Sequence, residues 1–98
     1  MDKPKILIVE DDEEIRMQMK WALTHAYEVY VAEERQRALE VFKAEHPAVV
    51  TLDLGLPPHP REVEEGFHAL GDILQEDASA KVIVITGRDE REHALRAI

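Results

Sequence analysis

The sequence predicts an α/β domain in which a parallel sheet carries helices on both faces. Short apolar segments alternate along the chain with longer segments whose apolar residues recur at helical spacing. Strands and helices that alternate at intervals of about 20–30 residues form βαβ units and a parallel sheet. The chain has 98 residues, which is enough for one domain with one core.

Four segments are expected to be strands, and each is too short and too apolar for a surface helix. They are KILIV (5–9), EVYVA (28–32), AVVTLDL (48–54) and KVIVIT (81–86). Helices are expected over 13–25, 34–46 and 62–76, and from residue 89 onwards. Pro47 ends the second of these helices, and the last one begins with acids, which suits the positive end of a helix dipole.

Each of the first three helices is expected to turn an apolar stripe towards the core. The stripes are Ile15, Met19, Ala22 and Leu23; Ala38, Leu39 and Phe42; and Val63, Phe67, Leu70 and Leu74. Trp21, on the first helix, is expected to be in the core or partly buried.

The composition excludes several classes of function. With 21 acidic and 12 basic residues, the formal net charge is -9, which argues against electrostatic binding of nucleic acid or anionic lipid by this segment. The chain has no cysteine, so it has no disulfide, thiolate nucleophile or zinc-thiolate site. It also has no signal-peptide pattern and no apolar run of the roughly 20 residues that a membrane span needs. These absences predict a cytoplasmic protein.

Polar residues gather where the predicted strands end. The first strand ends in EDD (10–12), the third ends in Asp53, and the fourth ends in TG (86–87). Function in such sheets gathers outside the carboxyl ends of the strands, so these residues are expected to converge. Carboxylates this close repel one another, and Mg²⁺, which prefers oxygen ligands, relieves that repulsion.

Each of these features also has a simpler interpretation. The acids EDDEE (10–14) can be a solvated helix N-terminus, Asp53 can form a turn before a glycine, and Thr86 can be an ordinary strand residue. A chance combination of all three at neighbouring strand ends is improbable, so the sequence favours a site.

The motifs ILIVEDD, TLDLGLP and VIVITG, taken together, resemble the receiver domain of bacterial two-component response regulators. The resemblance runs from about residue 5 to the last residue. It implies a flavodoxin-like, CheY-like fold with strand order 2-1-3-4, from which the family's fifth strand and last helix are missing. The segments LDLGLPP and GRDEREHALRAI are similar in sequence to receivers of the σ54-activator, NtrC-like type.

The resemblance assigns roles to particular residues. It implies that Asp53 accepts a phosphoryl group and that Asp11, Asp53 and the backbone carbonyl of Gly55 bind Mg²⁺ directly. Glu10 would contribute to the metal site mostly through a bound water. The remaining implied residues are Thr86 and Gly87, which would contact the phosphoryl group as part of a switch, and Pro57, which would shape the loop.

The implied function is a signalling switch rather than a metabolic enzyme. A sensor histidine kinase would donate a phosphoryl group to Asp53, with at most self-phosphorylation and self-dephosphorylation as activity. The switch would control an output domain, most often one that binds DNA and regulates transcription. The alternative is an inactive or phosphorylation-independent receiver that acts as a protein interaction module.

Two departures from the family pattern stand out. The family's lysine at the end of a fifth strand has no counterpart, because Lys81 lies at the wrong end of its strand and Arg88 is expected on a solvated loop. The segment PHPREVEE (58–65) lengthens the loop before the third helix, either as a tolerated surface insertion or as a border of the site that tunes kinase choice or phosphoryl lifetime.

Residues 1–98 are therefore expected to be a C-terminally truncated receiver domain without its output domain. The segment VIVI (82–85) is apolar on both faces, as is typical of an interior strand. Without a fifth strand it would be a bare sheet edge, so the sequence also predicts a homodimer formed by domain swapping or by edge-to-edge pairing.

Overall fold

The structure is a computed structural model that describes residues 3–58 and 62–85. Its elements, in chain order, are β1 (Lys5–Val9), α1 (Glu13–Leu23), β2 (Glu28–Ala32), α2 (Arg35–Glu45), β3 (Val49–Asp53), α3 (Glu64–Glu76) and β4 (Lys81–Ile85). Every predicted strand is present to within one residue at each end. The helix expected from residue 89 lies outside the described residues.

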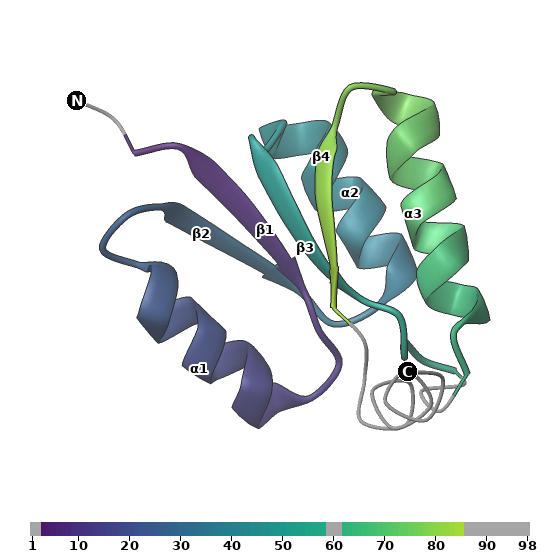
Figure 1. The fold of residues 1–98 in the computed structure, drawn as a ribbon, viewed down its shortest axis with the longest axis horizontal. Coiled ribbons are helices and arrows are strands. Elements are labelled where there is room, and N and C mark those ends of the chain that lie inside the picture. The colour runs from purple at the N-terminus through teal and green to yellow at the C-terminus, as the bar shows by residue number, and fades with distance from the viewer. Residues whose placement is uncertain (1–2, 59–61, 86–98) are drawn as a thin grey trace, which may run out of the picture.

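The four strands form one parallel sheet in the order β2-β1-β3-β4. Helix α1 lies on one side of this sheet, and α2 and α3 lie side by side on the other (Figure 1). The predicted fold class and strand order are confirmed. Because every strand runs the same way, all four carboxyl ends meet at one edge.

The main core lies between the sheet and the pair α2 and α3. Alternate residues of the strands point to this side, so each contributes every second side chain. The buried members are Leu7, Val9, Ala32, Ala38, Val41, Phe42, Val50, Leu52, Leu56, Ala69 and Ile73. Ile6 and Ile8 are equally buried but face the α1 side.

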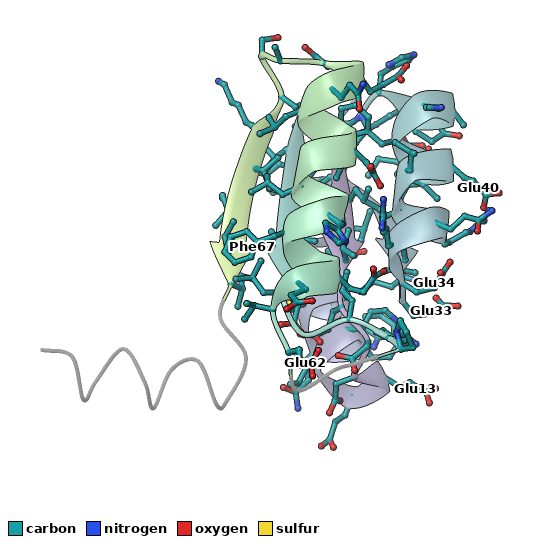
Figure 2. All side chains as sticks on the ribbon, turned by 90° about the vertical axis from the view of Figure 1, so that its right-hand side faces the viewer. Glu13, Glu33, Glu34, Glu40, Glu62 and Phe67 are labelled. Carbon is teal, nitrogen blue, oxygen red and sulfur yellow. The ribbon has the colours of Figure 1, made fainter. Side chains whose placement is uncertain are left out.

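The apolar stripe expected on α3 is only partly correct, since Leu70 is half-buried against the main core but two other members are exposed. The buried residues of this helix are Gly66, Ala69 and Ile73, whereas Phe67 and Leu74 are 52% and 37% exposed. Small residues lie against the sheet because they allow the helix to approach it closely, and close approach is decided by packing rather than by hydropathy. Figure 2 shows Phe67 on the side of α3 next to β4.

The stripe expected on α1 is also only partly correct. Met19 and Leu23 are half-buried against the sheet, but no residue of α1 is fully buried and Ile15 is 44% exposed. The expectation that Trp21 is in the core is wrong, since its side chain is 68% exposed. At 3.6 residues per turn, Trp21 lies about 200° round the helix from Met19, and so points away from the sheet.

An ion pair joins the two helices of the main core. The Arg35 guanidinium donates to both carboxylate oxygens of Asp72, at 2.7 and 3.3 Å, and to Glu65 at 3.4 Å. Arg35 opens α2, and both acids lie on α3. None of the helices described for this chain combines the length and the apolar character needed to cross a membrane.

Candidate functional site

Three carboxylates meet at the carboxyl edge of the sheet. Glu10 and Asp11 follow β1 directly, and Asp53 is the last residue of the neighbouring strand β3. One oxygen from each lies within 4.8 Å of the other two. The predicted convergence of the acids of the first and third strands is therefore confirmed.

Glu10 is fixed from both its backbone and its side chain. Its N–H donates to the carbonyl of Ala32 at the end of β2, at 3.0 Å, and its Oε2 accepts from the Asp12 N–H at 3.2 Å. Only 5% of the residue is exposed. A carboxyl group held this far from water needs a proton or a cation to be tolerated.

Asp12 has a different task from its two neighbours. It is the N-cap of α1, and its Oδ1 accepts the Ile15 N–H at 3.0 Å. The acids at 10–14 therefore fit both interpretations given by the sequence, a carboxylate site and a helix N-terminus. Glu10 and Asp11 join the carboxylate cluster, while Asp12, Glu13 and Glu14 begin a helix, where acids interact favourably with the dipole.

Asp53 both forms a turn and belongs to the carboxylate cluster, the two roles that the sequence allowed. Its Oδ1 accepts the Gly55 N–H at 3.1 Å, which is the contact that a turn-forming aspartate makes. It is nevertheless 7% exposed and faces Glu10 and Asp11. Because the turn occupies Oδ1, the second carboxylate oxygen carries no backbone bond from this turn.

Burial sets the proton affinity of this cluster. Removal from water and the hydrogen bond to the Asp53 side chain together raise the pKa of Glu10 to about 8. Burial also raises the pKa of Asp53, although the hydrogen bond from Glu10 opposes that rise. Both shifts favour protonation of this pair of carboxyl groups when no cation neutralises them.

The chemistry of the cluster fits a hard divalent cation. All three groups offer carboxylate oxygens, which Mg²⁺ prefers, and two of them are buried. Among the described residues, no lysine, arginine or histidine forms an ion pair with any of the three. The acids labelled in Figure 2 include Glu13, Glu33, Glu34 and Glu62, which surround the same end of the molecule and add to its negative potential.

The other predicted site residues have mixed outcomes. Gly55 is buried beside Asp53, and Pro57 lies on the wall of a cavity of about 400 Å³ between the start of α2 and α3. Lys81 pairs with the first residue of β3, at the opposite end of the strand from Asp53, so its exclusion from the site is confirmed. Thr86, Gly87 and Arg88 lie outside the described residues.

Two residues beside the site escaped the sequence analysis. The Nη1 of Arg16 donates to the backbone carbonyls of Glu10, at 3.0 Å, and Asp11, at 3.4 Å. The N–H of Gly66 donates to the carbonyl of Leu54 at 3.1 Å. Each left a signal in the sequence, since a cation in the first turns of a helix and a glycine inside a helix are both unfavourable without a specific contact.

The profile of the response regulator receiver domain matches residues 6–98. The chain belongs to the response regulator receiver family. Receiver domains are signalling switches rather than classical enzymes, and they generally bind Mg²⁺ in an acidic pocket. In this receiver, Glu10, Asp11 and Asp53 form an acidic cluster whose oxygens are close enough together to hold a metal ion.

Individual relatives agree with this membership. The chain is 33% identical over 96 residues to the chemotaxis protein CheY of Bacillus subtilis and covers 76% of it. Its fold is similar to NtrX from Brucella abortus, with a TM-score of 0.80 and 27% identity. It is also similar to the anti-anti-sigma factor PhyR from Bartonella quintana, with a TM-score of 0.74 and 27% identity.

The matches to NtrX and PhyR cover nearly all of this chain but only a small part of those two proteins. The match to NtrX includes 97% of this chain, and the match to PhyR includes 93% of it. It spans only 21% of the NtrX chain and 36% of the PhyR chain. Those proteins therefore contain much more than the part that this receiver resembles.

Proposed function

We propose that this receiver accepts a phosphoryl group on Asp53 and so acts as the switch of a two-component response regulator. The observation that supports this proposal best is the cluster of three carboxylates around the end of β3. A lone buried aspartate would be costly, but an aspartate beside Glu10 and Asp11 forms a site that a divalent cation can neutralise.

Residues Glu10, Asp11 and Asp53, with the backbone carbonyl of Gly55, would hold Mg²⁺. When bound, the ion would neutralise charge on the oxygens of the phosphoryl group and allow an anionic donor to approach the acids. Burial raises the pKa of Glu10, so binding of the ion would compete with protonation of this carboxyl group.

The reaction would join one oxygen of Asp53 to phosphorus while the bond between phosphorus and the imidazole nitrogen of a sensor kinase histidine breaks. The Gly55 N–H holds Oδ1 of Asp53 and leaves the other oxygen for attack. Water would later hydrolyse the acyl phosphate and restore the carboxylate. The protein aligns the groups and balances charge, as is usual in phosphoryl transfer.

The consequence of phosphorylation would be a change in how the chain contacts an output partner. Phosphate adds negative charge at the carboxyl edge of the sheet, and Thr86 and Gly87 are proposed to respond to it, with Pro57 shaping the adjacent loop. The partners would be a sensor histidine kinase and an output domain that regulates transcription, with residues 1–98 as the receiver part of that longer protein.

Labelling with a small acyl-phosphate donor, with and without Mg²⁺, tests this function. The wild type is expected to gain one phosphoryl group only when Mg²⁺ is present, and Asp53→Asn is expected to gain none. Asp12→Asn is the matched control, because Asp12 caps α1 and does not belong to the cluster. Labelling of Asp53→Asn, or labelling that is independent of Mg²⁺, would contradict the proposal.

A phosphorylation-independent interaction module is the second candidate. The similarity to PhyR, an anti-anti-sigma factor, supports it, because that name describes an effect exerted through protein binding. This candidate predicts that partner binding is the same for the wild type and Asp53→Asn. The first candidate predicts that only the wild type changes its partner binding after phosphorylation.

Self-association is proposed from the described sheet. In that sheet β4 pairs only with β3, and Ile83 and Val84 are 56% and 41% exposed. An exposed apolar edge strand favours pairing with a second copy or domain swapping. Sedimentation that gives only a stable monomer at high concentration would contradict this.

The segment 58–65 is proposed to tune kinase choice or phosphoryl lifetime. Pro58 and Glu65 line the same cavity as Pro57, beside the start of α2. A variant without residues 59–62 is expected to keep its fold and to change either the kinase preference or the rate of phosphoryl loss. Identical values for both properties would show that the segment is only a tolerated insertion.

A further inference from the structure

Arg16 occupies a place where a positive charge is not expected. It is the fourth residue of α1, close to the end where the helix dipole is positive, and basic residues are unfavourable there. Among the described residues it pairs with no carboxylate. Its guanidinium turns back instead towards the loop between β1 and α1, which carries the two acids that follow β1.

The contacts of Arg16 close a ring of hydrogen bonds around this loop. Its Nη1 donates to the carbonyl of Glu10 at 3.0 Å and to that of Asp11 at 3.4 Å. Its own N–H donates to the carbonyl of Asp12 at 2.9 Å. The Asp12 N–H donates in turn to Oε2 of Glu10. One side chain therefore ties the first turns of α1 to the backbone of both acids.

We propose that Arg16 is a positioning residue that fixes the backbone of Glu10 and Asp11 so that their carboxylates face Asp53. This inference rests on the proposed function, because it assumes that the three acids bind a divalent cation together. Arg16 would not touch the ion. It would act through two carbonyls, as the partners of metal ligands commonly do.

The sign of the effect separates positioning from simple electrostatics. Removal of a positive charge beside an acidic cluster should strengthen cation binding if charge alone matters. Removal of a positioning contact should weaken binding, because the ligands must be ordered when the ion arrives. Outer-shell substitutions typically weaken metal affinity roughly tenfold to 100-fold.

Calorimetric titration with Mg²⁺ at low ionic strength is the test, with Arg16→Met and Arg16→Lys as variants. Arg16→Met is expected to bind Mg²⁺ about tenfold more weakly than the wild type, and Arg16→Lys, which keeps the charge without the planar fork, is expected to lie between them. Lys20→Met is the matched control, since it removes the same charge one turn later and is expected to bind no more weakly than the wild type.

Equal or stronger binding by Arg16→Met would overturn the positioning role while leaving the proposed function intact. Absence of Mg²⁺ binding by the wild type would instead contradict the proposed function. Amide hydrogen exchange then decides about Arg16 without any metal. Exchange at Asp12 and Ile15 that is faster in Arg16→Met than in Lys20→Met supports the role, and equal exchange in the two variants overturns it.

Discussion

Gly66, in the first turn of α3, lies directly against Leu54, the residue after Asp53. The Gly66 N–H donates to the Leu54 carbonyl at 3.1 Å, and a Cβ built on Gly66 would overlap the Cα and carbonyl group of Leu54. The two ends of the loop after Asp53 are therefore in contact. A loop closed in this way can change its length between those ends at little cost, which explains how segment 58–65 is accommodated.

Gly66→Ala is expected to destabilise the domain by about 1–3 kcal/mol, because the methyl group must push the backbone of Leu54 away from α3. Gly71→Ala is the matched control on the same helix, where no atom lies within 4 Å of the added methyl. It should stabilise the domain by about 0.5–1 kcal/mol, since alanine favours a helix. Urea unfolding measures both, and an equal effect of the two substitutions would contradict the close contact.

Stability is expected to fall as the pH rises through the range set by Glu10. Burial raises its pKa from 4.5 to about 8, so the folded state binds the proton more tightly than the unfolded state. The contribution of this bound proton to the free energy of unfolding is complete below about pH 4.5 and is lost as the pH rises through about 8. Urea unfolding across this range measures it. Glu10→Gln should show a flatter profile, and an unchanged profile would contradict the assignment.

Mg²⁺ affinity is expected to rise with pH over the same range. The ion competes with the proton held by Glu10 and Asp53, so binding should release a proton below about pH 8. Calorimetry in two buffers of different ionisation enthalpy measures the number of protons released. Binding that is independent of pH between 6 and 8 would show that the acids are already ionised.

Thr51 carries a buried hydroxyl for which the described residues provide no hydrogen-bond partner. Thr51→Val replaces this hydroxyl with a methyl of similar shape and is expected to stabilise the domain by about 1 kcal/mol. Thr51→Ser keeps the hydroxyl, removes the methyl, and should destabilise the domain by about 0.8 kcal/mol. Thermal unfolding distinguishes them, and a loss of stability in Thr51→Val would indicate that the hydroxyl has a partner.

The pair formed by Arg35 and Asp72 is expected to contribute more than the other helical ion pairs. Asp72→Asn should cost up to about 1 kcal/mol, because the pair is bidentate and links two helices. Glu40→Gln is the control, since Glu40 and Arg37 lie 3.7 Å apart on one helix and are both more than half exposed. Its effect on urea unfolding should be close to zero. Equal effects would show that the link between α2 and α3 adds nothing.

The faces of the helices were the least predictable part of the fold. Hydropathy placed Phe67 in the core, but the structure places Gly66 and Ala69 there, because small residues let α3 approach the sheet. Trp21 was expected in the core or partly buried, yet its side chain is 68% exposed. Such side chains can be assigned to a face only when the neighbouring layers are known.

The sequence by itself determined the alternation of strands and helices and placed acids at the ends of the first and third strands. Those features are local, because strand periodicity and turn chemistry depend on nearby residues. The convergence of the acids then follows, because the carboxyl ends of parallel strands lie at one edge of the sheet. Tertiary structure alone decided that Arg16 holds the loop of Glu10 and that Gly66 abuts Leu54. The Gly66 contact depends on how α3 packs against the loop after β3, and the Arg16 contact depends on the direction in which α1 leaves the loop after β1. Neither geometry is encoded in the hydropathy pattern.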